Sequence, residues 1–321
     1  MRFRRMFALI FRRTILMVVV LWCVVTIAFF LVRSAPGGPF TRERSISPDI
    51  LAQLMREANL EGTLWEQYAT YMGLHKNPSG EYNGLLQGNL GISLKMRGRS
   101  VGELISQNLP VSALLGFSAL VISATVGIWL GALAAVRHHT WIDRSAMLGA
   151  LALISIPTFA TGPLLVLIFA LWLRWLPVGG WTSVSSVILP AITLSGPFIA
   201  FIARLMRASM LEVLRQDFVR TAHAKGLAER RVIYKHALKV AILPVVSYLG
   251  PLAANLLTGS IVVEMVFNLP GIGSFFVSSI LNRDHTLLLG VTILYCTLLI
   301  GFNLLVDIAY SWIDPRIRLG E

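Results

Sequence analysis

Six long apolar stretches without a single Lys, Arg, Asp or Glu constrain this chain more than any other feature. A helix needs about 20 mostly apolar residues to cross the hydrocarbon core of a bilayer. The stretches that meet this requirement are Thr14–Val32, Leu104–Val136, Ser145–Leu173, Trp175–Ala203, Val240–Val263 and Thr286–Val306. Because irregular backbone would leave polar groups unsatisfied in lipid, the sequence predicts an all-α polytopic membrane protein with six transmembrane helices.

The composition excludes the common soluble classes of protein. Charged residues make up 14% of the 321 residues and hydrophobic residues 55%, whereas a soluble domain carries about 25% charged residues. The net charge of +12 would by itself suggest a nucleic-acid partner. The basic residues, however, gather beside the predicted spans, as they do in the cytoplasmic loops of membrane proteins. The charge therefore indicates membrane orientation, and no nucleic-acid partner is expected.

The distribution of Lys and Arg predicts which segments face the cytoplasm. Basic residues are concentrated in the tail at 1–13, around Arg137 and Arg144, between Arg204 and Lys239, and after the sixth span. All of these positions lie inside if there are six spans. The predicted organisation is a cytoplasmic N-terminal tail at 1–13, span 1 at 14–32, an extracytoplasmic segment at 33–103, and a core at 104–321 that holds spans 2–6 and an inside loop at 204–239.

Two segments leave room for other topologies. Met265–Asn282 is also uncharged, but the run Asn268–Gly273 would break a helix, so we expect an outside or re-entrant loop there. The first span could instead be a secretory signal, because a basic start precedes its apolar core. The run Ser34–Pro36 is a poor cleavage site, and we expect a retained span.

The extracytoplasmic segment contains two candidate helices. Ser47-Pro48-Asp49 has the pattern of a helix start. The apolar residues on one face of the two helices are Ile50, Leu51, Leu54, Met55 and Ala58 in the first and Leu64, Trp65, Tyr68 and Tyr71 in the second. A packed cap on the membrane domain and a docking surface for a soluble partner are both consistent with this pattern.

The residue pattern of the inside loop predicts two short amphipathic helices joined at Gly226. A second helical stretch, Ala228–Leu238, follows the glycine. The apolar residues that recur at helical spacing before it are Leu211, Leu214, Phe218 and Ala222. Such a pair can lie flat on the membrane surface or insert into a groove of a cytosolic partner. The residues alone leave both possibilities open.

The same loop resembles a known family. Thr221-Ala222-x-x-x-Gly226 resembles the cytoplasmic signature Glu-Ala-Ala-x-x-x-Gly of ABC importer permeases, with Arg220 in place of Glu and Thr221 in place of the first Ala. The segments Arg220–Leu227, His236–Lys239 and Leu243-Pro244 are similar to the oligopeptide, dipeptide and nickel subclass of these permeases.

Further segments extend the resemblance over essentially the whole chain. They are Arg33-x-Ala35-Pro36-Gly37, Gly88–Ser93, Gly259–Glu264, Phe267–Gly273, Asn282–Asp284 and Asp314-Pro315. Asn89 stands where the family pattern has Asp. Within the subclass, Pro39–Arg44 and Leu176–Trp181 resemble the B-type oligopeptide permeases.

The resemblance implies a fold, a location and a set of partners. The fold is that of type I ABC importer permeases, with both termini cytoplasmic, in the cytoplasmic (inner) membrane of a bacterium, and the cargo is oligopeptides. The implied partners are a homologous second permease subunit, two ATPase subunits and an extracytoplasmic peptide-binding protein, besides membrane lipid. The residues implied to couple this chain to an ATPase are Arg220, Thr221, Ala222, Lys225, Gly226 and Leu227.

The chain itself is not expected to be an enzyme. The sequence lacks the Gly-x-x-x-x-Gly-Lys-Ser/Thr phosphate loop. The resemblance therefore implies that ATP and Mg are bound by the partner ATPases and that this chain carries no cofactor. Dipeptide or nickel cargo remains an alternative within the same importer class. A secondary carrier or channel that works without ATPase subunits is the alternative from a different class.

Few polar groups are predicted at membrane depth. Glu264 and Asp307 are ionisable residues near span ends, and such residues are functional candidates by default. Each could instead lie near an interface or pair with a backbone group or an amide such as Asn303. The adjacent His138 and His139 would point about 100° apart on a helix, unlike a ligand pair at i and i+4, so no metal site is expected.

Overall fold

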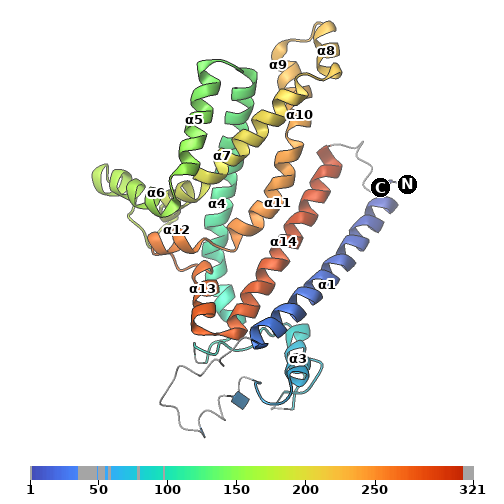
Figure 1. Cartoon of the computed structure of the whole chain (residues 1–321), viewed down its shortest axis with the longest axis vertical. Coiled ribbons are helices and arrows are strands. Elements are labelled where there is room, and N and C mark those ends of the chain that lie inside the picture. The colour runs from blue at the N-terminus through green and yellow to red at the C-terminus, as the bar shows by residue number, and fades with distance from the viewer. Residues whose placement is uncertain are drawn as a thin grey trace. The chain divides into compact units, whose positions relative to one another are not determined.

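The computed structural model describes the backbone of residues 2–34, 49, 55–56, 59–77, 80–96 and 98–313, and the side chains of this part from residue 12 to residue 305. The described residues form helices joined by turns, without a β-strand among them (Figure 1). Contacts divide the chain into two compact units. The first unit contains residues 1–110 and 271–297, and the second contains residues 111–270 and 298–321.

Four described helices are long and apolar enough to cross a membrane. They are α1 (Arg2–Ser34), α4 (Val101–Val136), α7 (Ile188–Val213) and α14 (His285–Ile313). Two bent pairs meet the same criterion together, namely α5 (Trp141–Ser155) with 158–172, and 229–241 with α11 (Leu243–Leu257). The described part therefore offers four to six candidate spans, which confirms the all-α polytopic class.

Shorter elements connect these helices. They are α3 (Leu64–Met72), α6 (Thr158–Leu165), α8 (Asp217–Ala224), α9 (Glu229–Arg231), α10 (Leu238–Ala241), α12 (Ile261–Val266) and α13 (Gly273–Asn282), with π-helical turns at Val166–Trp172 and Val232–Ala237 and 3-10 turns at Leu85–Gln87 and Val184–Val187.

Proline explains why the third predicted span is not a straight helix. The chain bends by 103° between α5 and α6. Pro157 lies at the bend, and Ile156 before it adopts an extended conformation with φ −94° and ψ 118°. Proline disfavours the helical conformation of the residue that precedes it. A smaller bend of 49° separates α10 from α11, where Pro244 stands in the first turn of α11.

The helix that corresponds to the fourth predicted span differs from it in extent. The fourth was expected at Trp175–Ala203, but the membrane-length stretch is Val184–Val213. Its expected start is an irregular turn, in which Gly180 has φ +81°. Beyond its expected end α7 continues for a further ten residues, so the first part of the predicted inside loop at 204–239 is helical. The stretch expected to hold the fifth span, Val240–Val263, contains α11, which ends at Leu257.

Helix α7 forms the centre of the second unit. In its apolar, membrane-length stretch 67% is buried, compared with 11% in the corresponding stretch of α1 and 22% in that of α14. Two glycines of α4 allow the close approach of these helices, because side chains at Gly127 and Gly131 would collide with Ile202 and with the carbonyl oxygen of Ala203. The low burial of α1 and α14 is typical of helices with apolar faces toward lipid or another subunit.

Two apolar clusters hold the first unit together. The start of α4 packs on α14 through residues that include Val101, Leu104, Leu287 and Val291. The end of α1 packs on α3 and α14 through Val25, Phe29, Tyr68, Met72 and Leu289. Thr63 caps α3 in a reciprocal capping box, and the bond from the Thr63 amide lowers the pKa of Glu66.

The structure tests only one of the two helices predicted for the extracytoplasmic segment. The helix predicted after Ser47 lies almost entirely outside the described residues. The second prediction corresponds to α3, but its apolar face is only partly buried. Tyr68 is buried, whereas Leu64 and Trp65 are exposed.

Candidate functional site

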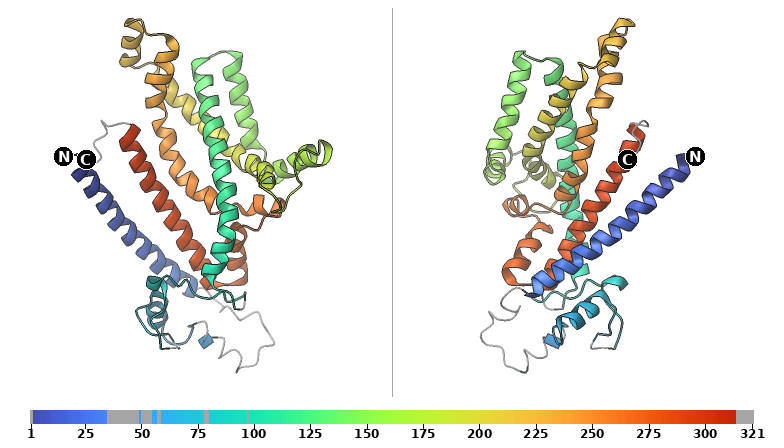
Figure 2. Two further views of the ribbon diagram at one scale, coloured as in Figure 1. Left: turned by 180° about the vertical axis from the view of Figure 1, so that it is seen from behind. Right: turned by 45° about the vertical axis from the view of Figure 1, so that its right-hand side comes forward.

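Helix α8 and the turn after it form a compact projection at one end of the second unit (Figures 1 and 2). The helix ends in a Schellman motif, in which the Gly226 amide donates to His223 O and the Leu227 amide donates to Ala222 O. Gly226 has φ +74°, a conformation that glycine adopts without the strain of a Cβ. The predicted glycine bend is therefore present, and its cause is helix termination.

The structure separates the predicted coupling residues into an exposed and a buried set. Ala222 is buried, and Leu227 is half-buried against the same apolar core. The exposed set consists of Arg220, Thr221, Lys225 and Gly226. The projection thus presents polar groups outward while its small apolar face fixes it to the unit. Whether these residues contact an ATPase stays a prediction.

The predicted apolar pattern of the first inside helix was wrong in detail. Leu211 lies in α7 and Leu214 in the turn after it, so they do not share a helix with Phe218 and Ala222. Phe218 is 38% exposed, whereas its neighbour Val219 is 2% exposed. Because the helix breaks between Val213 and Asp217, the buried face of α8 does not continue the buried face of α7. A helical periodicity counted across this break therefore assigns the wrong residues to the buried face.

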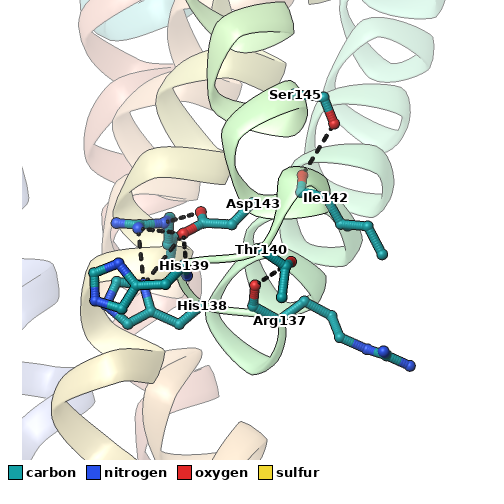
Figure 3. Close-up of polar contacts among 8 residues, drawn as sticks. Arg137, His138, His139, Thr140, Ile142, Asp143 and Ser145 are labelled. Atoms are coloured by element: carbon teal, nitrogen blue, oxygen red, sulfur yellow. Dashed lines mark hydrogen bonds and ion pairs between the residues drawn. The ribbon is translucent and has the colours of Figure 1, made fainter.

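An ion pair between a buried carboxylate and a half-buried guanidinium joins the start of α5 to the later part of α7 (Figure 3). Arg207 donates from Nε to Asp143 Oδ1 at 2.6 Å and from Nη2 to Asp143 Oδ2 at 2.8 Å. The His139 amide donates to Asp143 Oδ2 at 3.1 Å, and His138 Nδ1 lies 3.2 Å from the same oxygen. The carboxylate, 4% exposed, therefore has partners for both oxygens.

Sequence reasoning missed this site. It considered His138 and His139 only as metal ligands, and the described residues contain no group of three or more His, Cys, Asp and Glu suited to a metal. The available signal was that Asp143 and Arg207 carry opposite charges at the same predicted membrane side of neighbouring spans. That signal was hidden because Arg207 was assigned to a loop.

The predicted intramembrane polar residues have separate environments. Glu264 in α12 is 1% exposed, and its Oε1 accepts a hydrogen bond of 2.7 Å from the Ser112 hydroxyl of α4. Asn303 is exposed on α14. Asp307 belongs to the same helix, but its side chain lies outside the described residues, so its pairing with Asn303 stays a prediction.

The structure brings together motifs that the sequence analysis listed separately. In the first unit, Asp284 accepts hydrogen bonds from the Ser93 hydroxyl and from the amides of Leu94, Lys95 and Leu287. This links Gly88–Ser93 to Asn282–Asp284. In the second unit the Gly180 amide donates to the Phe267 carbonyl at 2.8 Å. This links Leu176–Trp181 to Phe267–Gly273.

Comparison with known proteins agrees with this architecture. Residues 127–319 match the family described as "Binding-protein-dependent transport system inner membrane component". The oligopeptide transport system permease protein OppB of Salmonella typhimurium is 43% identical over 315 residues, which cover 98% of this chain and 100% of that protein. The dipeptide transport system permease protein DppB of Bacillus subtilis is 40% identical over 298 residues, which cover 93% and 94%.

A solved structure shows the same fold at low sequence identity. A chain of the MetNI methionine ABC transporter, determined in inward-facing conformations, superposes with a TM-score of 0.54. The match covers 66% of this chain and 96% of that chain at 16% identity. The fold of the matched part is therefore that of a type I ABC importer permease.

The membrane-length helices and this fold define the class of the protein as a polytopic permease subunit of a transport system. The chain belongs to the family of binding-protein-dependent transport system inner membrane components. It is thus an inner-membrane protein that acts with ATPase and other subunits of an ABC transporter. Family membership displaces the alternative of a carrier or channel that works alone.

Proposed function

We propose that this chain is the permease subunit of an ATP-driven importer of oligopeptides and forms half of its translocation path. The assignment of oligopeptides as the cargo rests on the 43% identity to an oligopeptide permease over the full length of that protein. Dipeptides are the second candidate cargo, because a dipeptide permease is 40% identical over 298 residues.

The proposed ATPase contact is the α8 projection. Its exposed residues Arg220, Thr221 and Lys225 face away from the unit, and Val219 and Ala222 anchor it in the core. A short helix with an exposed polar face and a fixed base can transmit force from a partner to the helices behind it. ATP and Mg bind in the ATPases, and this chain carries no catalytic residue.

The complete importer contains this chain, a homologous second permease, two ATPases and an extracytoplasmic peptide-binding protein. ATP-driven closure of the ATPases moves the two α8 projections and so shifts the permeases between inward-open and outward-open states. Cargo enters the path after its release from the binding protein. ATP thereby biases an equilibrium between two conformations that both exist in the permease.

Co-purification tests the composition and uptake tests the cargo. The tagged chain, extracted in mild detergent, should recover a second permease and two ATPases, identified by mass spectrometry. Vesicles with the whole complex and its binding protein should accumulate a labelled tetrapeptide only with ATP, and unlabelled tetrapeptide should compete better than dipeptide. Uptake without ATP would reject the importer, and preferential competition by dipeptide would change the cargo.

Photo-cross-linking tests the α8 contact directly. A photo-reactive amino acid at exposed Thr221 should form a cross-link to an ATPase subunit in the intact complex. The matched position is Thr125, which is exposed on α4 within a membrane-length helix and should form none. Equal cross-linking at both positions, or none at Thr221, would reject α8 as the contact.

A further inference from the structure

Four polar side-chain atoms of the described residues are buried without a hydrogen-bond partner, all of them in the first unit. One is the amide oxygen of Asn59, which is an acceptor. The other three can donate and lie at one corner of the unit: Arg33 Nε at the end of α1, Tyr71 OH in the last turn of α3 and His285 Nδ1 at the start of α14. Figure 2 shows the end of α1, helix α3 and the start of α14 at the same end of the first unit in both views. Burying a polar group without a partner costs free energy, so three such atoms in one place call for an explanation.

Two of the three side chains contact the Phe29 ring, and the third lies at the start of a helix that packs against it. Arg33 Cζ lies 5.3 Å from the centroid of the Phe29 ring, and the Tyr71 ring centroid lies 5.5 Å from the same centroid. His285 precedes Leu289 by one helical turn, and Leu289 packs in the cluster that contains Phe29. The charge of Arg33 acts electrostatically on both Tyr71 and His285.

Among the described residues, no carboxylate forms an ion pair with the Arg33 guanidinium. Its recorded partners are the amide oxygen of Gln67, at 2.9 Å from Nη1, and the face of Phe29, both uncharged. The nearby carboxylate of Asp284 accepts its hydrogen bonds from Ser93, Leu94, Lys95 and Leu287 instead. Arg33 thus retains an unused N–H in a half-buried position.

The hydrogen-bonding character of the three atoms indicates which chemical group fits the corner. A guanidinium N–H, a phenol O–H and an imidazole N–H, in the tautomer protonated on Nδ1, are all donors. A carboxylate offers two oxygens and no donor, and its hydrogen bonds to guanidinium are charge-assisted. His285 is 7% exposed while Arg33 is half-buried, so a ligand reaches the corner from the side of Arg33.

We propose that Arg33, Tyr71 and His285 form a binding site for a carboxylate group of the cargo. The identification of the cargo rests on the proposed function, because a peptide supplies a carboxylate at its C-terminus. By the predicted topology the corner lies on the extracytoplasmic side, where cargo enters. The site would hold the C-terminus of a peptide at the start of the path.

Binding to the purified full-length chain tests the site without transport. Calorimetric titration with tri-alanine should show binding, and tri-alanine amide, which lacks the carboxylate, should bind at least about 10-fold more weakly. Arg33→Gln and Tyr71→Phe should each weaken tri-alanine binding by about 10-fold and leave amide binding unchanged, since each removes one donor to the carboxylate.

Tyr68→Phe is the matched control. Tyr68 lies on the same helix, but its hydroxyl is already hydrogen-bonded to Thr26 Oγ1 at 2.6 Å. The control should leave binding unchanged and lower thermal stability in ligand-free buffer. Tyr71→Phe should not lower stability there, because its hydroxyl has no partner to lose. Destabilisation by Tyr71→Phe in the ligand-free chain would overturn the proposal.

The remaining outcomes separate the site from the transport function. Equal binding of the acid and the amide, or no effect of either variant, overturns the site. In vesicles with the complete importer, Tyr71→Phe should reduce ATP-driven uptake of tri-alanine relative to its amide. Selective binding of the acid by a complex that takes up no peptide would keep the carboxylate site and reject the proposed function.

Discussion

At the scale of single residues, the pair of Asp143 and Arg207 shows how a charge is accommodated inside this chain. The carboxylate is 4% exposed and accepts two hydrogen bonds from one guanidinium. Desolvation of such a pair is offset only while both partners are present. The pair fixes the turn between α4 and α5 to α7, shortly before α7 ends and α8 begins.

Asp143→Asn should destabilise the chain by about 1–3 kcal/mol, because it leaves the half-buried Arg207 guanidinium without its counter-charge. Asp143→Leu combined with Arg207→Met should be less destabilising than the single change. Unfolding in sodium dodecyl sulfate, followed by tryptophan fluorescence, measures both.

The exposed pair of Asp217 and Arg220 provides the control. Their charged atoms are 3.7 Å apart, and the side chains are 97% and 76% exposed. Replacing Asp217 by Asn should not change unfolding measurably, because exposed pairs contribute little. An equal effect at Asp143 and Asp217 would contradict the structural role of the buried pair.

Gly226 is the second residue whose local geometry predicts a measurable effect. Its φ of +74° is disfavoured for a β-branched residue, although a Cβ there would meet no atom within 4 Å. Gly226→Val should therefore reorient the end of α8 without harming core packing. We expect normal insertion and at least about a 10-fold loss of ATP-driven uptake, since every transport step is proposed to pass through this contact.

Two variants show whether the position or the strain is responsible. Gly226→Asn should retain most of the uptake, because Asn tolerates the left-handed conformation. Gly98 has φ +75° and equally open space in the first unit, so Gly98→Val imposes similar strain away from α8 and should retain uptake. Normal uptake by Gly226→Val would reject the coupling role of the turn.

At the scale of elements, the crossing of α4 and α7 depends on glycine. Gly131→Ala should destabilise the second unit by about 1–3 kcal/mol, because the added methyl group would collide with backbone of α7 that cannot move alone. Thermal unfolding of the purified chain measures the loss.

Gly149 on α5 is the matched position for this test. A Cβ at Gly149 would meet no atom within 4 Å. Gly149→Ala should be neutral or stabilising by about 0.5–1 kcal/mol, since alanine favours helix. Destabilisation by both variants would mean that helix–helix packing is not the cause.

At the scale of the whole molecule, orientation in the membrane is the property to test. Reporter fusions after residues 140, 225 and 318 should be cytoplasmic, and fusions after 38, 180 and 275 extracytoplasmic. The reason is that Lys and Arg flanking the spans favour the cytoplasmic side. A cytoplasmic reporter at 180 would mean that the bent pair of α5 and 158–172 re-enters the membrane without crossing it.

The sequence predicted the features that depend on local pattern. Apolar stretches such as Thr14–Val32 identify membrane-length helices because the bilayer fixes their length. Gly226 identified the end of α8, since few other residues adopt its conformation. The limits of α7 were not predictable in this way. Arg207 was assigned to a loop because of its charge, yet it lies in α7, where its guanidinium pairs with Asp143, 64 positions earlier.

By itself the sequence determined the all-α membrane class, the resemblance to ABC importer permeases and the glycine-terminated turn of α8. The class and the turn follow from composition, periodicity and residues close together in the chain, and the resemblance rests on short matching segments along it. Only the tertiary structure decided which face of α8 is buried, that Asp143 pairs with Arg207, and that Arg33, Tyr71 and His285 keep unused donors at one corner. The physical reason is that burial and hydrogen bonding depend on side chains that meet only after the helices pack.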